Sequence, residues 1–170
     1  MENRKRVKDK VDEILSKIVE ALKRRFGEDL VSVVLFGSFA RGDFHERSDI
    51  DLLIVVESLP ESKFERSRIF DEAVWDELRD DLRELRRMGY LSQPMPIMKT
   101  REEAEYRSPL YLDMTEDAVI LYDKGGFFES VLEGMRKRLR ELGARRKRLK
   151  SGGWYWDLKP DYKPGDVIEI

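Results

Sequence analysis

Residues 35–56 read LFGSFARGDFHERSDIDLLIVV, an apolar run, a Gly-Ser pair, a polar segment and a second apolar run. Ten residues separate Ser38 from Asp49, and only Ile50 separates Asp49 from Asp51. Alternate side chains of a strand share a face, so both aspartates are expected to point the same way, with Cα atoms about 7 Å apart. Neighbouring carboxylates repel each other, and a hard cation relieves that repulsion. The spacing therefore predicts a Mg²⁺ site.

The runs on either side of the polar segment predict two buried strands. Residues 30–36 and 48–56 are short, apolar and rich in β-branched side chains, which is typical of strands inside a sheet. Residues 37–47 then form the loop between them. An aspartate pair at the start of a strand can also be only a turn and a cap. Because the Gly-Ser pair, the spacing and both strands agree, we favour a ligand site.

This segment resembles the active-site hairpin of the DNA polymerase β-type nucleotidyltransferase superfamily, and most closely the minimal nucleotidyltransferase domains of prokaryotes. The signature of these domains is Gly-Ser, ten residues and Asp-x-Asp, present here as Gly37, Ser38, Asp49 and Asp51. The resemblance implies a mixed α/β nucleotidyltransferase fold, with a small twisted mixed sheet and flanking helices.

The resemblance also implies an activity, the transfer of a nucleoside monophosphate from a nucleoside triphosphate, foremost ATP, to a hydroxyl acceptor. Six residues receive roles: nucleotide binding for Gly37, Ser38, Arg41 and Ser48, and catalysis together with binding of one or two Mg²⁺ ions for Asp49 and Asp51. Small proteins of this kind often act as antitoxins that adenylylate or sequester a HEPN-type ribonuclease. A HEPN-type partner is therefore an implied alternative.

Other polar residues of the loop leave two interpretations open. A guanidinium such as that of Arg41 or Arg47 can clamp phosphate oxygens, or can be a solvated loop charge. His45 is the one histidine, and an exposed loop histidine is favoured over a catalytic base. Asp43 is expected to cap the loop rather than bind metal.

One part of the family pattern is missing. Two-metal sites of this superfamily normally use a third carboxylate from a neighbouring strand. The strand expected to carry it, residues 91–99, contains no Asp or Glu. The possible oxygen ligands that it offers instead are the side chains of Ser92 and Gln93. The substrate could supply its own activation, or the domain could bind a nucleotide without transferring it. Alternatively, a carboxylate comes from elsewhere, with three candidates: Glu57, Glu102 and Asp113.

Composition narrows the class of protein. A chain of 170 residues predicts one domain, and 33 basic against 35 acidic residues predict no nucleic-acid partner from overall charge. The absence of cysteine excludes disulfides and cysteine-ligated zinc. The polar N-terminus is unlike a signal peptide, and no apolar run reaches the length of a membrane span. We expect a cytoplasmic protein without membrane contact.

Apolar periodicity predicts the remaining elements. Helices are expected at 7–26, 61–88, 101–107, 109–114 and 127–150, an irregular or edge strand at 91–99, and a strand at 118–122. A break at Gly125 and Gly126 suggests a nucleotidyltransferase domain over 1–125 and, over 126–170, a C-terminal helix and turn-rich tail, with two short strands conceivable, packed on the same domain.

The end of the last predicted helix is strongly basic. Residues 136–150 could bind RNA phosphates, and the aromatic residues 154–156 could stack on bases. Because the apolar stripe of the helix is intact and the net charge is near zero, we favour a solvated basic face and do not expect nucleic-acid binding.

Overall fold

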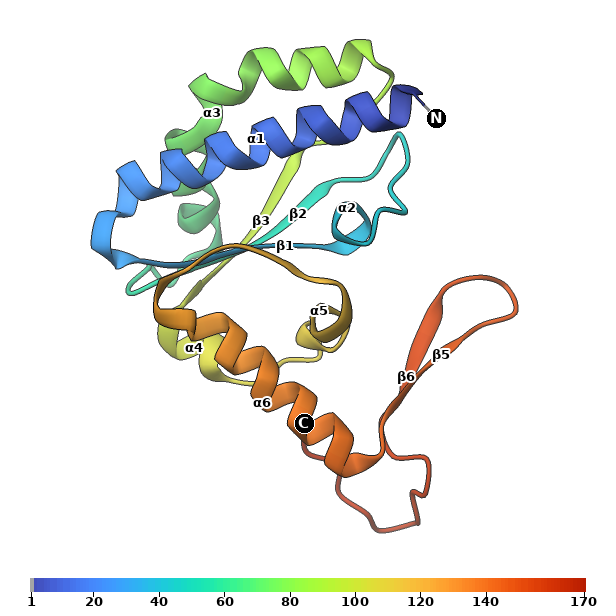
Figure 1. Ribbon diagram of the computed structural model, residues 1–170. Helices are drawn as coiled ribbons and strands as arrows, with labels where there is room; N and C mark the ends of the chain where they lie inside the picture. The colour runs from blue at the N-terminus through green and yellow to red at the C-terminus, as the bar shows by residue number, and fades with distance from the viewer. Residues whose placement is uncertain (1) are drawn as a thin grey trace.

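The computed structural model describes residues 2–170, and its centre is a four-stranded sheet of order β3-β2-β1-β4. β1 (Leu30–Phe36) pairs antiparallel with β2 (Ile50–Val56) and with β4 (Val119–Asp123). β3 (Pro94–Thr100) runs parallel to β2 and forms one edge. The mixed sheet with flanking helices, visible in Figure 1, confirms the predicted fold class.

Helices cover both faces of this sheet. α1 (Glu2–Phe26) and α3 (Lys63–Arg87) pack on one face, as Figure 1 shows. The other face is covered by α4 (Arg101–Glu105), α5 (Tyr111–Asp117) and α6 (Phe127–Leu142). The two central strands are therefore buried on both sides, which is why their sequences are continuously apolar instead of alternating.

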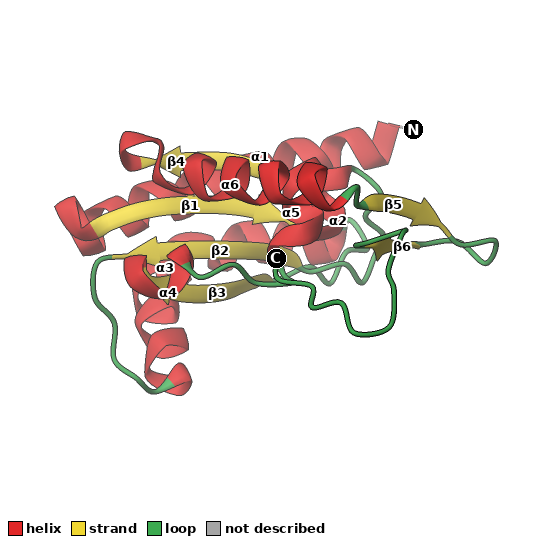
Figure 2. Ribbon diagram, turned by 90° about the horizontal axis from the view of Figure 1, so that it is seen from below, coloured by secondary structure: helices red, strands yellow, loops and turns green. Residues whose placement is uncertain are grey.

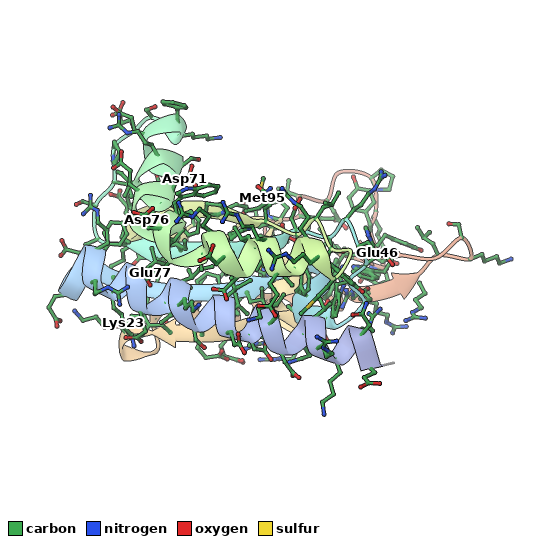
Figure 3. All side chains as sticks on the ribbon, turned by 90° about the horizontal axis from the view of Figure 1, so that it is seen from above. Lys23, Glu46, Asp71, Asp76, Glu77 and Met95 are labelled. Atoms are coloured by element: carbon green, nitrogen blue, oxygen red, sulfur yellow. The ribbon has the colours of Figure 1, made fainter. Side chains whose placement is uncertain are left out.

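The outer side of α1 and α3 holds much of the charge of the chain. In Figure 3, which looks onto these helices, Lys23, Asp76 and Glu77 are labelled on that side. Asp81 is the exception, because it is buried between the helices and accepts a hydrogen bond from Lys17. This ion pair connects α1 to α3 across their interface.

Two predictions for the chain segments were wrong. Residues of the expected loop form a short helix, α2 (Gly37–Arg41). The helix predicted for 127–150 ends at Leu142, because Gly143 adopts φ +67° and closes it as a left-handed cap. Residues beyond the cap form a hairpin of β5 (Arg145–Arg148) and β6 (Trp154–Asp157). The basic residues of β5 therefore do not continue the helix.

β3 is a regular edge strand despite its prolines. The Ile50 N–H donates to the Gln93 carbonyl at 2.9 Å, which sets the phase of the parallel ladder. With this phase, the nitrogen atoms of Pro94 and Pro96 point away from β2. The missing N–H groups of these prolines therefore cost no hydrogen bond between the two strands. The same prolines leave few donors on the open edge, so addition of another strand there is disfavoured.

The C-terminal segment contacts the rest of the chain. α6 buries Phe128, Leu132 and Met135 in the core on its face of the sheet, and Trp156 and Ile170 pack against the same core. The division at residue 125 stays a prediction. Among residues 2–170, no helix has both the length and the apolar character needed to cross a membrane.

Candidate active site

The turn at Gly37 lies directly against Asp51. Phe36, the last residue of β1, pairs with Asp51 in β2, so the chain leaves β1 beside this carboxylate. Gly37 has φ +73°, and a Cβ added there would lie 2.2 Å from Asp51 Oδ2. No side chain fits into that distance, and the positive φ also favours glycine. The predicted Gly-Ser turn and the predicted metal ligand therefore form one surface at the end of the sheet.

Asp49 and Asp51 form a carboxylate pair that no neighbouring residue neutralises fully. Asp49 is exposed and Asp51 is half-buried at the start of β2. Burial raises the pKa of Asp51, the charge of Asp49 raises it further, and the Arg41 guanidinium opposes both effects. No ion pair within residues 2–170 reaches the Asp51 carboxylate. Two hard oxygen ligands with excess negative charge fit Mg²⁺ in chemical type.

On the neighbouring strand, a methionine lies beside Asp51. Met95 of β3 is the partner of Asp51 in the parallel register, so both side chains share a face of the sheet. Met95 is 53% exposed and lies on the open edge, where Figure 3 labels it. Ser92 is buried, and Gln93 is exposed at the start of this segment. The described residues, 2–170, contain no group of three acidic, histidine or cysteine side chains suited to a metal.

The three candidate carboxylates lie elsewhere. Glu57 follows the far end of β2 and pairs with Arg101 at 3.0 Å. Glu102 lies on α4, which begins at the far end of β3. Asp113, on α5, is nearer: it lines a cavity of about 210 Å³ together with Gly37. Its Oδ1 atom, however, accepts hydrogen bonds from two tryptophan side chains, each at 2.9 Å.

Ser38 and Arg41 both lie on α2, the short helix that follows β1. The Ser38 carbonyl accepts the Gly42 and Asp43 N–H groups at 2.9 and 3.1 Å, which closes α2. Arg41, the last residue of α2, donates from Nε to Asp43 at 3.2 Å and lines the same cavity as Gly37. Its charge therefore lies beside the predicted phosphate site, and Asp43 partners Arg41.

The remaining loop residues hold the loop together. Ser48 is buried, and its Oγ atom accepts the His45 N–H at 2.9 Å. His45 is exposed, and its Nδ1 atom accepts the Arg47 N–H at 3.2 Å. In this arrangement the Ser48 hydroxyl shapes the loop, and a role in nucleotide binding stays a prediction.

The sequence interpretation left short strands conceivable in the tail that contains β6, but it placed β5 in a helix and so missed the hairpin. This hairpin lies at the same end of the sheet as α2 (Figure 2). The Trp154 ring lies 4.6 Å from the guanidinium carbon of Arg41 and 4.0 Å from that of Arg146. Arg146 in turn pairs with Asp117 of α5 at 2.7 Å. The alternation of Trp154 and Trp156 around one residue was the available strand signal.

Acidic partners neutralise much of the basic C-terminal segment. Arg136 pairs with Glu129 at 2.7 Å, and Arg140 pairs with Glu133 at 3.0 Å. On the hairpin, Lys147 pairs with Asp157 at 2.6 Å. The expectation that this segment does not bind nucleic acid stays a prediction.

Comparison with known proteins gives the family. The nucleotidyltransferase domain family matches residues 15–107, so the chain belongs to that family, as its signature predicted. "Putative protein adenylyltransferase MJ1305" of Methanocaldococcus jannaschii is 28% identical over 132 residues, 78% of this chain and 85% of that protein. "Putative protein adenylyltransferase MJ0141" of the same organism is 37% identical over 70 residues, 41% of this chain and 70% of that protein. A crystal structure of a toxin-antitoxin with AMP-PNP has a TM-score of 0.45 and 15% identity, covering 76% of this chain and 92% of that chain.

Proposed function

We propose that this protein is a Mg²⁺-dependent nucleotidyltransferase that moves a nucleoside monophosphate from a nucleoside triphosphate to a hydroxyl acceptor. The observation that carries the proposal is the contact of the Gly37 turn with Asp51, where a Cβ would lie 2.2 Å from the carboxylate oxygen. This contact joins the turn, which lines a cavity of about 210 Å³, to a carboxylate pair that forms no ion pair within residues 2–170.

In this proposal each residue has a separate task. Asp49 and Asp51 hold Mg²⁺, which neutralises charge on the phosphates. The backbone of Gly37 and Ser38 contacts the terminal phosphates, and Arg41 adds a guanidinium on the same side. The acceptor oxygen bonds to the α-phosphorus and its proton passes to water, while the bond from this phosphorus to the bridging oxygen breaks and pyrophosphate leaves. Positioning and charge neutralisation are the main contributions of the protein.

We propose a protein hydroxyl as the acceptor and ATP as the donor. Support comes from the relatives named as protein adenylyltransferases, one of which is matched over 85% of its length. A HEPN-type partner, adenylylated or sequestered by an antitoxin, is a narrower form of the same proposal. It rests on the family resemblance alone.

A second candidate is a nucleotide-binding module with impaired transfer. Met95 favours it, because this residue pairs with Asp51 on the strand where the family places a third carboxylate. Loss of one ligand or activating base lowers the rate by orders of magnitude while phosphate binding persists.

Labelled nucleotides separate the two candidates. The purified protein is incubated with Mg²⁺, a cell extract and ATP labelled at either the α- or the γ-phosphate. Transfer of the nucleoside monophosphate labels an extract protein from α-labelled ATP only, since the γ-phosphate leaves in pyrophosphate. The binding module instead retains Mg²⁺-ATP without labelling any product. Protein labelled equally from both nucleotides, or no ATP binding at all, would contradict the proposed function.

The chain offers a matched control for this experiment. Asp49→Asn with Asp51→Asn removes the proposed metal ligands, and we expect it to abolish labelling. Asp71→Asn with Asp76→Asn makes the same chemical change on the exposed side of α3, away from the sheet end (Figure 3). The control is expected to label the extract as the wild type does.

A further inference from the structure

The hairpin of β5 and β6 adds an aromatic residue to the candidate active site. It lies outside residues 15–107, which the nucleotidyltransferase family matches. Figure 2 shows it beside α2, and Trp154 of β6 contacts Arg41 at the end of that helix. An element appended to the family domain thus reaches a residue next to the Gly37 turn.

Trp154 is held firmly in its position. Its indole Nε1 donates to Asp113 Oδ1 at 2.9 Å, and the Arg146 guanidinium carbon lies 4.0 Å from the ring centroid. Arg146 is fixed by Asp117 at 2.7 Å. Asp113 and Asp117 are one helical turn apart on α5, so they form a single anchor for the hairpin. The ring is therefore a fixed surface against which another side chain can be ordered.

Arg41 is ordered by this surface without losing all its donors. Its Nε donates to Asp43 at 3.2 Å, and its guanidinium carbon lies 4.6 Å from the Trp154 ring centroid. Its two Nη groups make no hydrogen bond within the described part of the chain. A guanidinium over an aromatic ring keeps its in-plane N–H donors available, and those donors match phosphate oxygens.

We propose that Trp154 is a positioning residue that holds the Arg41 guanidinium beside the Gly37 turn, ready to bind the oxygens of a nucleoside triphosphate. This inference rests on the proposed function, because it needs a triphosphate at that turn. Without the ring, the long arginine side chain samples many rotamers and loses that freedom when the nucleotide binds. The ring thus favours triphosphates over monophosphates.

Calorimetry tests this role with two probes, a non-hydrolysable ATP analogue and AMP, each with Mg²⁺. Trp154→Leu removes the ring, and we expect a roughly tenfold loss of affinity for the ATP analogue with little change for AMP. Trp154→Phe keeps an aromatic face for Arg41 and is expected to bind nearly as the wild type. Tyr155→Leu is the control, because Tyr155 is 46% exposed on the opposite face of the hairpin.

A double-mutant cycle tests the connection to Arg41. In an Arg41→Met background, Trp154→Leu is expected to cause no further loss, because the side chain that it orders is gone. Asp113→Ala releases the indole N–H but leaves the ring, and it is expected to weaken the ATP analogue in the same direction. This variant keeps the inference testable should Trp154→Leu fail to fold.

Three outcomes contradict the inference. In the first, Trp154→Leu binds the ATP analogue as tightly as the wild type. Should Trp154→Leu fail to fold, wild-type affinity in Asp113→Ala is the corresponding result. In the second, the loss is equally large in the Arg41→Met background. In both, wild-type binding persists and the proposed function stands. In the third, the wild type binds no ATP analogue, and the proposed function fails together with the inference.

Discussion

Replacing Gly37 by alanine tests the contact on which the active-site assignment depends. The added Cβ would lie 2.2 Å from Asp51 Oδ2, 3.1 Å from its Cγ and 3.3 Å from its Cβ. The carboxylate is the end of a movable side chain, whereas the turn is backbone. We therefore expect Asp51 to move away and the turn to persist.

The structure sets the size of two separate effects. Alanine at φ +73° is strained by about 1–2 kcal/mol. For a chain of this length, that strain lowers Tm by roughly 2–8 °C. Relief of the clash displaces the Asp51 carboxylate by roughly 1 Å. A displacement of about that size in a catalytic group lowers the rate by roughly 100-fold.

Gly42→Ala separates strain from displacement. Gly42 has φ +80°, but a Cβ there meets no atom within 4 Å. It is therefore expected to lower Tm by a similar amount while Mg²⁺-dependent binding of the ATP analogue is retained. Gly37→Ala should lower Tm and also lose Mg²⁺-dependent binding of the ATP analogue. Thermal unfolding and calorimetry on the two variants give the comparison.

Two results would refute this reasoning. If Gly37→Ala binds the Mg²⁺-nucleotide as tightly as Gly42→Ala, the carboxylate beside the turn holds no metal. If both variants lose the nucleotide equally, backbone strain in α2 is responsible, and the contact with Asp51 has no special role.

Four further outcomes follow from the charges. In the metal-free protein, Asp51→Asn is expected to increase the free energy of unfolding at pH 7 by about 1 kcal/mol, measured by thermal melting in a chelator, because repulsion from Asp49 disappears. Burial and Asp49 raise the pKa of Asp51, so Mg²⁺-nucleotide affinity should fall on acidification at a higher pH than for an ordinary aspartate. Arg41→Met should move that loss to still higher pH in calorimetric titrations, because Arg41 lowers this pKa. The hydrogen bond from Arg66 lowers the pKa of Glu103 to about 2. Denaturant titrations should therefore show that Glu103→Gln lowers the free energy of unfolding by roughly 1 kcal/mol above about pH 5, and that this difference disappears towards pH 2.

Local sequence patterns determined the central part of this protein. The strand at residues 30–36 and the core of the next were predictable from apolar runs, because burial on both faces leaves no other pattern. The convergence of Gly37, Asp49 and Asp51 was predictable too, since strand alternation and a short connection confine them to one sheet end. The family match over residues 15–107 agrees with that signature.

Only the tertiary structure decided what surrounds these residues. Met95 lies opposite Asp51 because of a parallel register, which no local pattern specifies. Trp154 donates a hydrogen bond to Asp113, 41 positions earlier in the chain. The sequence did not predict this contact, because residues up to 150 were expected to form a helix. Spacing and periodicity describe residues that are close in sequence, whereas these contacts depend on how distant elements pack. Packing therefore decided that Met95 lies beside the proposed metal ligand Asp51 and that the Trp154 ring lies beside Arg41.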